Sequence, residues 1–424
     1  MDLLDDLHAR GLVHDTTDLA ALRGRLAQGP IGLYIGFDPT ADSLHVGHLV
    51  GQLFMRRFQL AGHRPFPLAG GATGMIGDPG GRSEERNLLD EDTLRHNVDR
   101  IKEQLSKLLD FEPGSFQATL VNNADWTTSI SMLEFLRDVG KHFTVNQMTA
   151  KDSVRSRIES EHGISYTEFS YMLLQANDFR HQYETHQVEL QAGASDQWGN
   201  IVAGVELIRR RLSEQAFAIT HPLMLKSDGS KFGKSASGSV WLAPERTSPY
   251  QFRQFWIQTD DRMIATYLRM LSLRPIDAIE ALLAQQLETP ERRAAQRTLA
   301  DELTAMVHGS QAAAAAAEAA TVLFGSDPTT ASADALDVVA AEVPSVALPA
   351  DIEGVRVHEF LIDAGVAKSG GEVNRLLGQG AVRAGNRVLD QDGLLRASDL
   401  LRGQFLLLRK GKRDFVAGKL SARG

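Results

Sequence analysis

The 424-residue chain contains no cysteine, which excludes disulfide bonds, thiolate metal sites and cysteine nucleophiles. It also lacks any apolar run that approaches the length of a membrane span. Its first residues, MDLLDDLHARG, are acidic and have no apolar core, so we do not expect a secretory signal peptide. Because the absence of cysteine also fits a reducing compartment, these features together predict a cytoplasmic protein with no membrane partner.

Charge is distributed unevenly along the chain, although the net charge is only −9. Residues 351–424 carry 13 Lys and Arg against 9 Asp and Glu, a net charge of +4, which leaves −13 for the first 350 residues. A basic tail on an acidic body predicts a separate module that binds a polyanion, with ordinary scatter of charge as the alternative. The length fits about two to four domains.

A strand, a turn and a helix are predicted for residues 31–62. The first part of this segment is an apolar, β-prone run, and the second part has apolar residues at i, i+4 spacing. We expect Asp42 or Ser43 to cap the helix over 43–61, and Gly62 to end it.

Two histidines stand at the start of this predicted helix. His45 and His48 are three residues apart and therefore project from one side of its first turn. Free backbone N–H groups and the helix dipole attract anions there. Gly36 and Gly47 have no side chain, which lets a flat ring or a phosphate approach the backbone. The pattern indicates a nucleotide-binding site with two imidazoles directed at phosphates. The alternative, two partly exposed histidines at a helix start with no ligand, explains the pattern equally well.

A second apolar run, in residues 64–78, passes into a Gly-rich loop that ends at Asp78. Such loops approach ligands closely, but the spacing is not that of a dinucleotide-binding fingerprint. Arg82 and Arg86 follow in a polar stretch. They can reach phosphates or form a solvated run of charge.

Residues 163–183 have helical periodicity on two sides. One side is apolar. The other carries a tyrosine, an amide and a carboxylate in a row, which can line a polar pocket or face water: Tyr171, Gln175 and Asp178. Further along, a strand in residues 188–200 leads to Asp196 and Gln197, at an edge where open α/β sheets bind ligands.

The segment from Gly229 to Ser235 reads GxxxGKS, one residue short of a phosphate-binding P-loop. That missing residue counts against a P-loop phosphotransferase, because the N–H groups of the loop must encircle a phosphate. Lys231 and Lys234 stand three residues apart on this Gly-containing loop, from which they can swing over a triphosphate.

These motifs resemble those of one family. His45-Val46-Gly47-His48 resembles the HIGH signature of class I aminoacyl-tRNA synthetases, and Lys231-Phe232-Gly233-Lys234-Ser235 resembles their KMSKS loop. The string from Tyr34 to His48 is similar to the tyrosyl members of that class. The tail, with two short helices, a hairpin and basic residues, resembles S4-type RNA-binding domains. The resemblance covers nearly the whole chain.

The resemblance implies an α/β fold with a Rossmann-like parallel-sheet catalytic domain, then an all-helical domain and a small α+β S4-like domain. The insertion near 120–160 would contribute to the interface of a homodimer. The implied divisions are the catalytic domain at 1–220, the KMSKS-type loop at 221–245, the helical tRNA-binding domain at 246–324 and the S4-like domain at 351–424. Between the last two, residues 325–350 are rich in Ala, Ser, Thr, Asp and Pro, a composition that predicts a linker.

The implied activity is that of a tyrosine–tRNA ligase. L-Tyrosine and ATP would give tyrosyl-adenylate and pyrophosphate, and the tyrosyl group would then pass to the terminal adenosine of tRNA(Tyr). Carboxylate attack on the α-phosphate needs positioning and positive charge near the β,γ-phosphates rather than a protein nucleophile. Mg²⁺ would accompany ATP, and no dedicated metal ligands are expected.

Residue roles follow from matching positions. Tyr34 and Asp178 would bind the hydroxyl of the substrate tyrosine. Asp78, Tyr171 and Gln175 would hold its ammonium group, with Gln197 close by in the tyrosine site. ATP and the adenylate would lie against Gly36, Asp38, Gly47, Gly193, Asp196 and Lys234. Catalysis on the phosphates would involve Thr40, His45, His48, Arg82, Arg86, Lys231, Lys234 and Ser235. RNA would contact Lys368, Arg375, Arg383 and Arg387.

The chain departs from the family pattern in places. Ala194 stands where a second glycine is usual, and Arg82 stands where lysine is common, which keeps charge but not shape. Two further hypotheses remain open. One is a tryptophanyl enzyme, whose family shares the core but lacks the S4-like tail. The other is a non-enzymatic RNA-binding protein built on a decayed synthetase.

Overall fold

The computed structural model describes residues 2–78, 89–161, 163–230, 232, 234–235, 238–391, 393–411 and 414–420. They form two compact units. The first unit comprises residues 1–247 and 255–299, and the second comprises 248–254 and 300–424. Among the residues described, no helix is long and apolar enough to cross a membrane.

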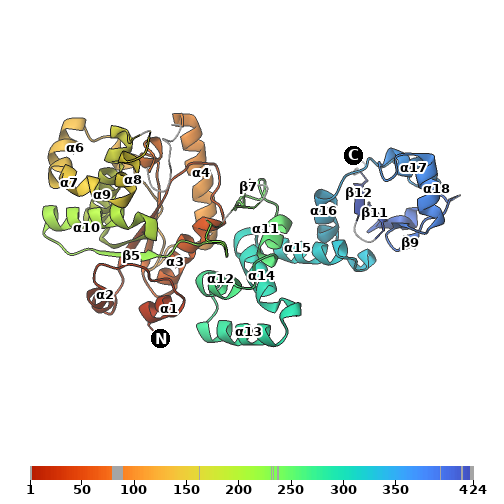
Figure 1. Cartoon of the computed structure of the whole chain (residues 1–424), viewed down its shortest axis with the longest axis horizontal. Coiled ribbons are helices and arrows are strands. Elements are labelled where there is room, and N and C mark those ends of the chain that lie inside the picture. The colour runs from red at the N-terminus through yellow and green to blue at the C-terminus, as the bar shows by residue number, and fades with distance from the viewer. Residues whose placement is uncertain are drawn as a thin grey trace. The chain divides into compact units, whose positions relative to one another are not determined.

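A parallel five-stranded sheet forms the centre of the first unit (Figure 1). Its order is β3-β2-β1-β4-β5, and each neighbouring pair is parallel. The strands are β1 (Gly32–Phe37), β2 (Arg64–Ala69), β3 (Val121–Asn122), β4 (Val188–Ala194) and β5 (Phe217–His221). Later strands are added on opposite sides of β1, so a crevice is expected where β1 meets β4, at their carboxyl ends. The predicted Rossmann-like fold is confirmed.

Helices cover both faces of this sheet (Figure 1). On one face lie α3 (Leu49–Leu60) and α4 (Glu91–Leu108), and on the other lie α9 (Tyr166–His186) and α10 (Trp198–Leu212). This division follows from right-handed crossover connections. From β1 to β3 the chain moves across the sheet in one direction, and from β3 through β4 to β5 it moves in the other, so the two pairs of helices lie on opposite faces. Buried apolar side chains fill both layers, among them Leu53 and Phe58 of α3 and Leu207 of α10.

The predicted helix over 43–61 begins later than expected, and the prediction that Asp42 or Ser43 caps it is wrong. Residues 44 and 46 exchange backbone hydrogen bonds with 240 and 242, which holds them extended. A short 3₁₀ turn, Val46–His48, capped by the His45 side chain, then leads into α3. Gly62 ends the helix with a positive φ of 89°, as predicted.

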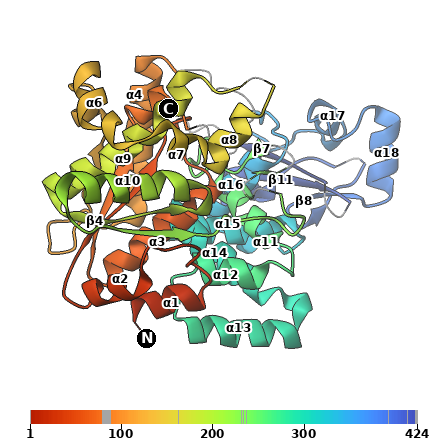
Figure 2. The ribbon, with the colours of Figure 1, turned by 60° about the vertical axis from the view of Figure 1, so that its left-hand side comes forward.

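Short helices precede and interrupt the sheet. α1 (Leu3–Ala9) and α2 (Leu19–Leu26) come before β1. The insertion between β3 and α9 contains α5 (Ala124–Thr127), α6 (Met132–Asp138), α7 (Val145–Thr149) and α8 (Asp152–Ile158). Figures 1 and 2 both place this insertion beside α9 and α10, where a shared apolar cluster joins them. On its outer side the insertion leaves large apolar residues exposed, among them Met132 (71%) and Leu133 (81%).

Beyond β5 the chain forms a small hairpin, β6 (Lys234–Ser235) and β7 (Gly238–Ser239). The helices that follow are α11 (Pro249–Ile257), α12 (Ile264–Leu271), α13 (Ile276–Glu288) and α14 (Ala294–His308). In the first unit, Phe232 packs against Phe255, Trp256 and Tyr267, with ring centroids 4.7–5.4 Å apart. An aromatic cluster therefore fixes this residue of the KMSKS-like loop.

The second unit contains an antiparallel sheet between two helical layers. Its strands are β8 (Val382–Ala384), β9 (Arg387–Val388), β10 (Leu400–Leu401), β11 (Phe405–Lys410) and β12 (Asp414–Lys419). Along β11 the side chains alternate. Leu406 and Leu408 pack with α17 (Val357–Asp363) and α18 (Gly370–Gly378), whereas Phe405 and Leu407 pack with α15 (Ser310–Leu323) and α16 (Ala333–Glu342).

The range 325–350, predicted to be a linker, contains helix α16. Ser332 caps this helix, and its buried Ala335, Leu336 and Val339 pack in the apolar cluster of the second unit. The Ala, Ser and Asp content that suggested a linker is also that of a short amphipathic helix with small buried residues.

Candidate active site

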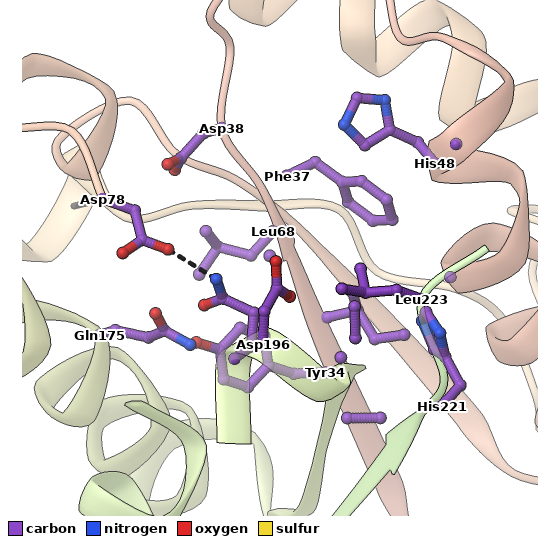
Figure 3. A pocket seen from close by; sticks show the side chains of 18 of the residues that line it. Tyr34, Phe37, Asp38, His48, Leu68, Asp78, Gln175, Asp196, His221 and Leu223 are labelled. Atoms are coloured by element: carbon purple, nitrogen blue, oxygen red, sulfur yellow. Dashed lines mark hydrogen bonds between the residues drawn. The ribbon is translucent and has the colours of Figure 1, made fainter. Parts of the chain in front are cut away.

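A cavity of about 400 Å³ opens in the first unit, at the carboxyl ends of β1 and β4 (Figure 3). It lies at the crevice that the strand order predicts. Thirteen of the predicted site residues line it together: Tyr34, Gly36, Asp38, His45, Gly47, His48, Asp78, Tyr171, Gln175, Asp178, Gly193, Asp196 and Gln197.

Thr40, by contrast, is not among the described residues that line this cavity. Thr40 is exposed in the turn after β1. Lys234 and Ser235 lie in strand β6. Arg82, Arg86 and Lys231 lie outside the described residues.

Tyr34 and Asp178 form the deepest polar part of the cavity, and each is only 1% exposed. The Tyr34 hydroxyl accepts a hydrogen bond from Gln191 Nε2 at 3.0 Å. The Asp178 carboxylate accepts one from Asn123 Nδ2 at 2.9 Å and one from Trp126 Nε1 at 2.8 Å. Helix α9 is therefore buried on its polar side as well as its apolar side, and the polar row does not face water.

Burial changes the ionisation of these groups. It raises the pKa of the Asp178 carboxyl to about 7, against the opposing effect of the Asn123 and Trp126 donors. Burial, followed by nearby carboxylates, also raises the pKa of the Tyr34 and Tyr171 hydroxyls well above the usual value. Both tyrosines therefore keep their protons at neutral pH and can donate hydrogen bonds.

Carboxylates and their donors occupy a second side of the cavity. The Tyr171 hydroxyl donates to Asp38 Oδ2 at 3.2 Å, and Thr73 Oγ1 donates to Asp38 Oδ1 at 3.2 Å. Gln197 Nε2 donates to Asp78 Oδ2 at 2.6 Å, the bond drawn in Figure 3. This concentration of carboxylate oxygen suits a cation.

The glycines of the loop after β2 have a structural role that the sequence does not reveal. A Cβ at Gly70 would lie 2.6 Å from Asp38 Oδ1, and one at Gly71 would lie 2.2 Å from Asn122 Oδ1. The missing side chains make room for Asp38, which lines the cavity, and for Asn122.

The two signature histidines stack at another part of the cavity, with ring centroids 4.0 Å apart. His48 Nδ1 accepts from the His45 N–H at 3.1 Å, and His45 Nδ1 accepts from the Gly47 N–H at 3.1 Å. In a neutral ring, the proton is then on Nε2. Burial, with a smaller effect of His45, lowers the pKa of His48 to about 3. His48 thus acts as an uncharged N–H donor at neutral pH.

Several residues of the site were not predicted: Thr73, Asn123, Trp126, Gln191 and His221. Two of them had a usable signal, because Gln191 and His221 are polar residues in β4 and β5, strands whose carboxyl ends lie at the edge where open α/β sheets bind ligands. The other three come from loops and a short helix, where no periodicity marks them. Among the described residues, no group of three or more His, Asp or Glu could hold a metal ion.

Comparisons with known proteins show the family to which the chain belongs. A family model described as tRNA synthetases class I (W and Y) matches residues 26–325, so the chain belongs to the class I aminoacyl-tRNA synthetases. A model of the tyrosine–tRNA ligase SYY-like C-terminal domain matches residues 335–417.

Individual relatives show to which family within this class the chain belongs. The tyrosine–tRNA ligase of Opitutus terrae is 51% identical over 99% of this chain and 100% of its own length. That of Geobacillus stearothermophilus is 49% identical over 98% and 99%. A solved structure of a C-terminally truncated mitochondrial tyrosyl-tRNA synthetase from Aspergillus nidulans has a TM-score of 0.68 at 30% identity and covers 76% of this chain and 94% of its own. Within its class, the chain is a member of the tyrosine–tRNA ligase family.

Proposed function

We propose that this chain activates L-tyrosine with ATP and transfers it to tRNA(Tyr). The observation that carries the proposal is the arrangement of one cavity. A buried hydroxyl and carboxylate, Tyr34 and Asp178, lie at its deep end, and the stacked N–H donors of His45 and His48 line it elsewhere.

The phenol of tyrosine is recognised by hydrogen bonds at the deep end. Because Tyr34 accepts from Gln191, its own proton is available for the substrate oxygen. Asp178 then accepts the proton of the substrate hydroxyl. A substrate without that hydroxyl would leave the Tyr34 proton without an acceptor, and Asp178 without the third donor beside Asn123 and Trp126. The loss of these two hydrogen bonds is the larger part of the discrimination against such a substrate.

The ammonium group of tyrosine lies against Asp78, Tyr171 and Gln175. Asp78 is 8% exposed and is held by Gln197, so its carboxylate is fixed before the substrate arrives. Prior fixing reduces the conformational entropy that is lost on binding. The substrate carboxylate then lies toward Asp38 and the nucleotide.

Activation requires that this carboxylate attack the α-phosphorus while pyrophosphate leaves. The bond between the α-phosphorus and the oxygen that it shares with the β-phosphorus breaks, and negative charge collects on the β- and γ-phosphates. The Nε2–H groups of His45 and His48 donate to these oxygens, as neutral donors in a site partly shielded from water. Thr40, Arg82, Arg86, Lys231 and Lys234 supply further donors and charge, and Ser235 belongs to the same loop. Gly36, Gly47, Gly193 and Asp196 line the adenylate.

Mg²⁺ enters with ATP, coordinated by the phosphates. We place the reaction in the cytoplasm, the compartment that the sequence features favour.

The second unit binds tRNA. Lys368 and Arg375 are exposed near α18, and Arg383 is partly exposed, as expected of phosphate contacts. Arg387 is different, since it donates two hydrogen bonds to the buried carboxylate of Asp399, at 2.6 and 2.5 Å. We therefore assign Arg387 mainly to the fold of this unit.

The insertion forms part of a homodimer interface. Support comes from its exposed apolar residues, Met132, Leu133, Leu136 and Val145, which gather on α6 and at the start of α7. Leu133→Glu should convert the protein to a monomer in sedimentation, while Glu134→Gln, beside it, should not.

Tyrosine-dependent exchange of pyrophosphate into ATP tests the proposed function. Exchange should require tyrosine among the twenty amino acids. Equal support by tryptophan would refute the tyrosine assignment, and no exchange at all would favour a non-enzymatic role.

A further inference from the structure

One buried side chain in the cavity has no role in the function described so far. His221 is the last residue of β5, is 6% exposed and lines the cavity (Figure 3). Its Nδ1 lies 3.1 Å from the carbonyl oxygen of Pro222. A carbonyl only accepts, so Nδ1 carries the proton, and Nε2 of the neutral ring is an acceptor. Burial lowers the pKa of this imidazole to about 4, which keeps the ring neutral at pH 7.

This arrangement is the reverse of that in the signature histidines. His45 and His48 accept backbone N–H groups at Nδ1 and therefore present N–H donors, which suit phosphate oxygens. His221 presents a lone pair, which repels phosphate oxygens and attracts a donor. Among the described residues, Pro222 is the hydrogen-bonding partner of its ring. The Nε2 atom therefore selects for an N–H or O–H group of a substrate.

The surroundings of His221 fit a flat ring. Leu223 and Met224 follow it in the chain and line the same cavity with apolar surface. Gly47 and Gly51 line it too, and bare backbone leaves room for a planar ligand. A Cβ at Gly51 would lie 3.8 Å from His221 Nε2, so a branched side chain at that position would extend over the acceptor.

We propose that His221 Nε2 accepts a hydrogen bond from the 6-amino group of the adenine of ATP and thereby selects adenine over purines with a carbonyl at that position. The inference rests on the proposed function, because it requires ATP in this cavity. The other donors of the two substrates already have partners there. In the proposed function, Asp78 and Asp178 take those of tyrosine, and Asp196 is assigned to the adenylate. Figure 3 shows His221 beside Leu223, on the side away from Asp78.

The test compares three nucleotides in tyrosine-dependent pyrophosphate exchange: ATP, ITP with a 6-carbonyl group, and purine riboside triphosphate with hydrogen there. Loss of one uncharged hydrogen bond corresponds to about a fivefold change. His221→Leu should therefore raise KM for ATP about fivefold and leave KM for purine riboside triphosphate unchanged. It should lower KM for ITP, because the repulsion between carbonyl and lone pair is removed. The kcat for ATP should stay within about twofold.

Two further variants separate recognition from packing. His221→Gln offers an amide oxygen near the place of Nε2 and should restore most of the preference for ATP. His63→Leu is the matched control, since His63 is also 6% exposed but does not line the cavity, and it should leave all three KM values in their wild-type ratio.

Equal weakening of all three nucleotides by His221→Leu would overturn the proposal, because the histidine would then only shape the pocket. Equilibrium binding of the three nucleotides gives the base preference without turnover. A wild-type protein that prefers ATP in binding but shows no exchange contradicts the proposed function and supports the role of His221. One that exchanges but binds ATP and purine riboside triphosphate equally contradicts only the role of His221.

Discussion

Replacing Asp178 by Asn is expected to stabilise the first unit at alkaline pH, although it removes a residue of the proposed tyrosine site. Burial raises the pKa of this carboxyl from 3.8 to about 7 in the folded chain. Between these values the folded chain holds a proton that the unfolded chain has lost. The free energy of unfolding therefore falls as pH rises from about 4, and the full loss is reached above pH 7.

The size of the effect follows from the shift and from the lost hydrogen bond. A difference of about three pKa units corresponds to about 4 kcal/mol. The Asn amide can accept from only one of the two donors, Asn123 and Trp126, and the unpaired donor costs about 1–3 kcal/mol at every pH. At pH 5 the wild-type chain has already lost about 1.6 kcal/mol of this linkage energy, so Asp178→Asn should change the free energy of unfolding by only about −1.4 to +0.6 kcal/mol there. At pH 8.5, where the whole of it is lost, the variant should be more stable by about 1–3 kcal/mol.

Tryptophan fluorescence during urea unfolding measures this change in one unit alone. All four tryptophans, at positions 126, 198, 241 and 256, belong to the first unit. Asp125→Asn, an exposed carboxylate nearby, is the matched control and should not change the pH dependence. If Asp178→Asn shifted the free energy of unfolding equally at pH 5 and pH 8.5, the argument that a buried charge destabilises this site would be refuted.

Three other predictions concern separate parts of the chain. His45→Ala should slow tyrosine activation about 10²–10³-fold, with tyrosine affinity within about twofold in equilibrium dialysis, and a large loss of affinity would contradict its phosphate role. Gly24→Ala, in the open interior of α2, should raise the free energy of unfolding by about 0.5–1 kcal/mol, whereas Gly29→Ala, at φ 140°, should lower it in the same urea assay. Arg375→Glu should raise KM for tRNA and leave pyrophosphate exchange unchanged. Arg387→Met should destabilise the second unit by on the order of 3 kcal/mol, because it leaves the buried Asp399 carboxylate without its cation, and hydrogen exchange in β8 and β9 should become faster.

The central sheet and the place of the site were predictable because they depend on local periodicity and connection rules. Apolar runs and i, i+4 spacing located β1 and α3, and the end of β1 located the crevice. The two histidines were expected on one side of the helix start, and the structure stacks them at 4.0 Å.

Long-range pairing accounts for most of what the sequence did not reveal. Nothing near residue 42 indicates that residues 44–46 pair with a strand-like segment at 240–242, yet that pairing delays the helix. Likewise, Asn123 and Trp126 hold Asp178 from more than fifty positions away in the chain. The polar row of α9 was ambiguous for the same reason, because periodicity gives the face of a helix but not what covers it.

The burial that destabilises the site also gives it selectivity. Asp178 is buried, so its ionisation costs free energy. Its charged form depends on the hydrogen bonds that Asn123 and Trp126 donate. In the proposed complex, a tyrosine hydroxyl adds a further donor to that carboxylate and an acceptor for Tyr34, so the ligand would offset part of the desolvation cost that folding imposed. A ligand without the hydroxyl fills the space and excludes water but supplies neither bond. Discrimination between substrates therefore originates in the unliganded protein, where Tyr34 and Asp178 are already buried before a substrate binds and completes their hydrogen bonds.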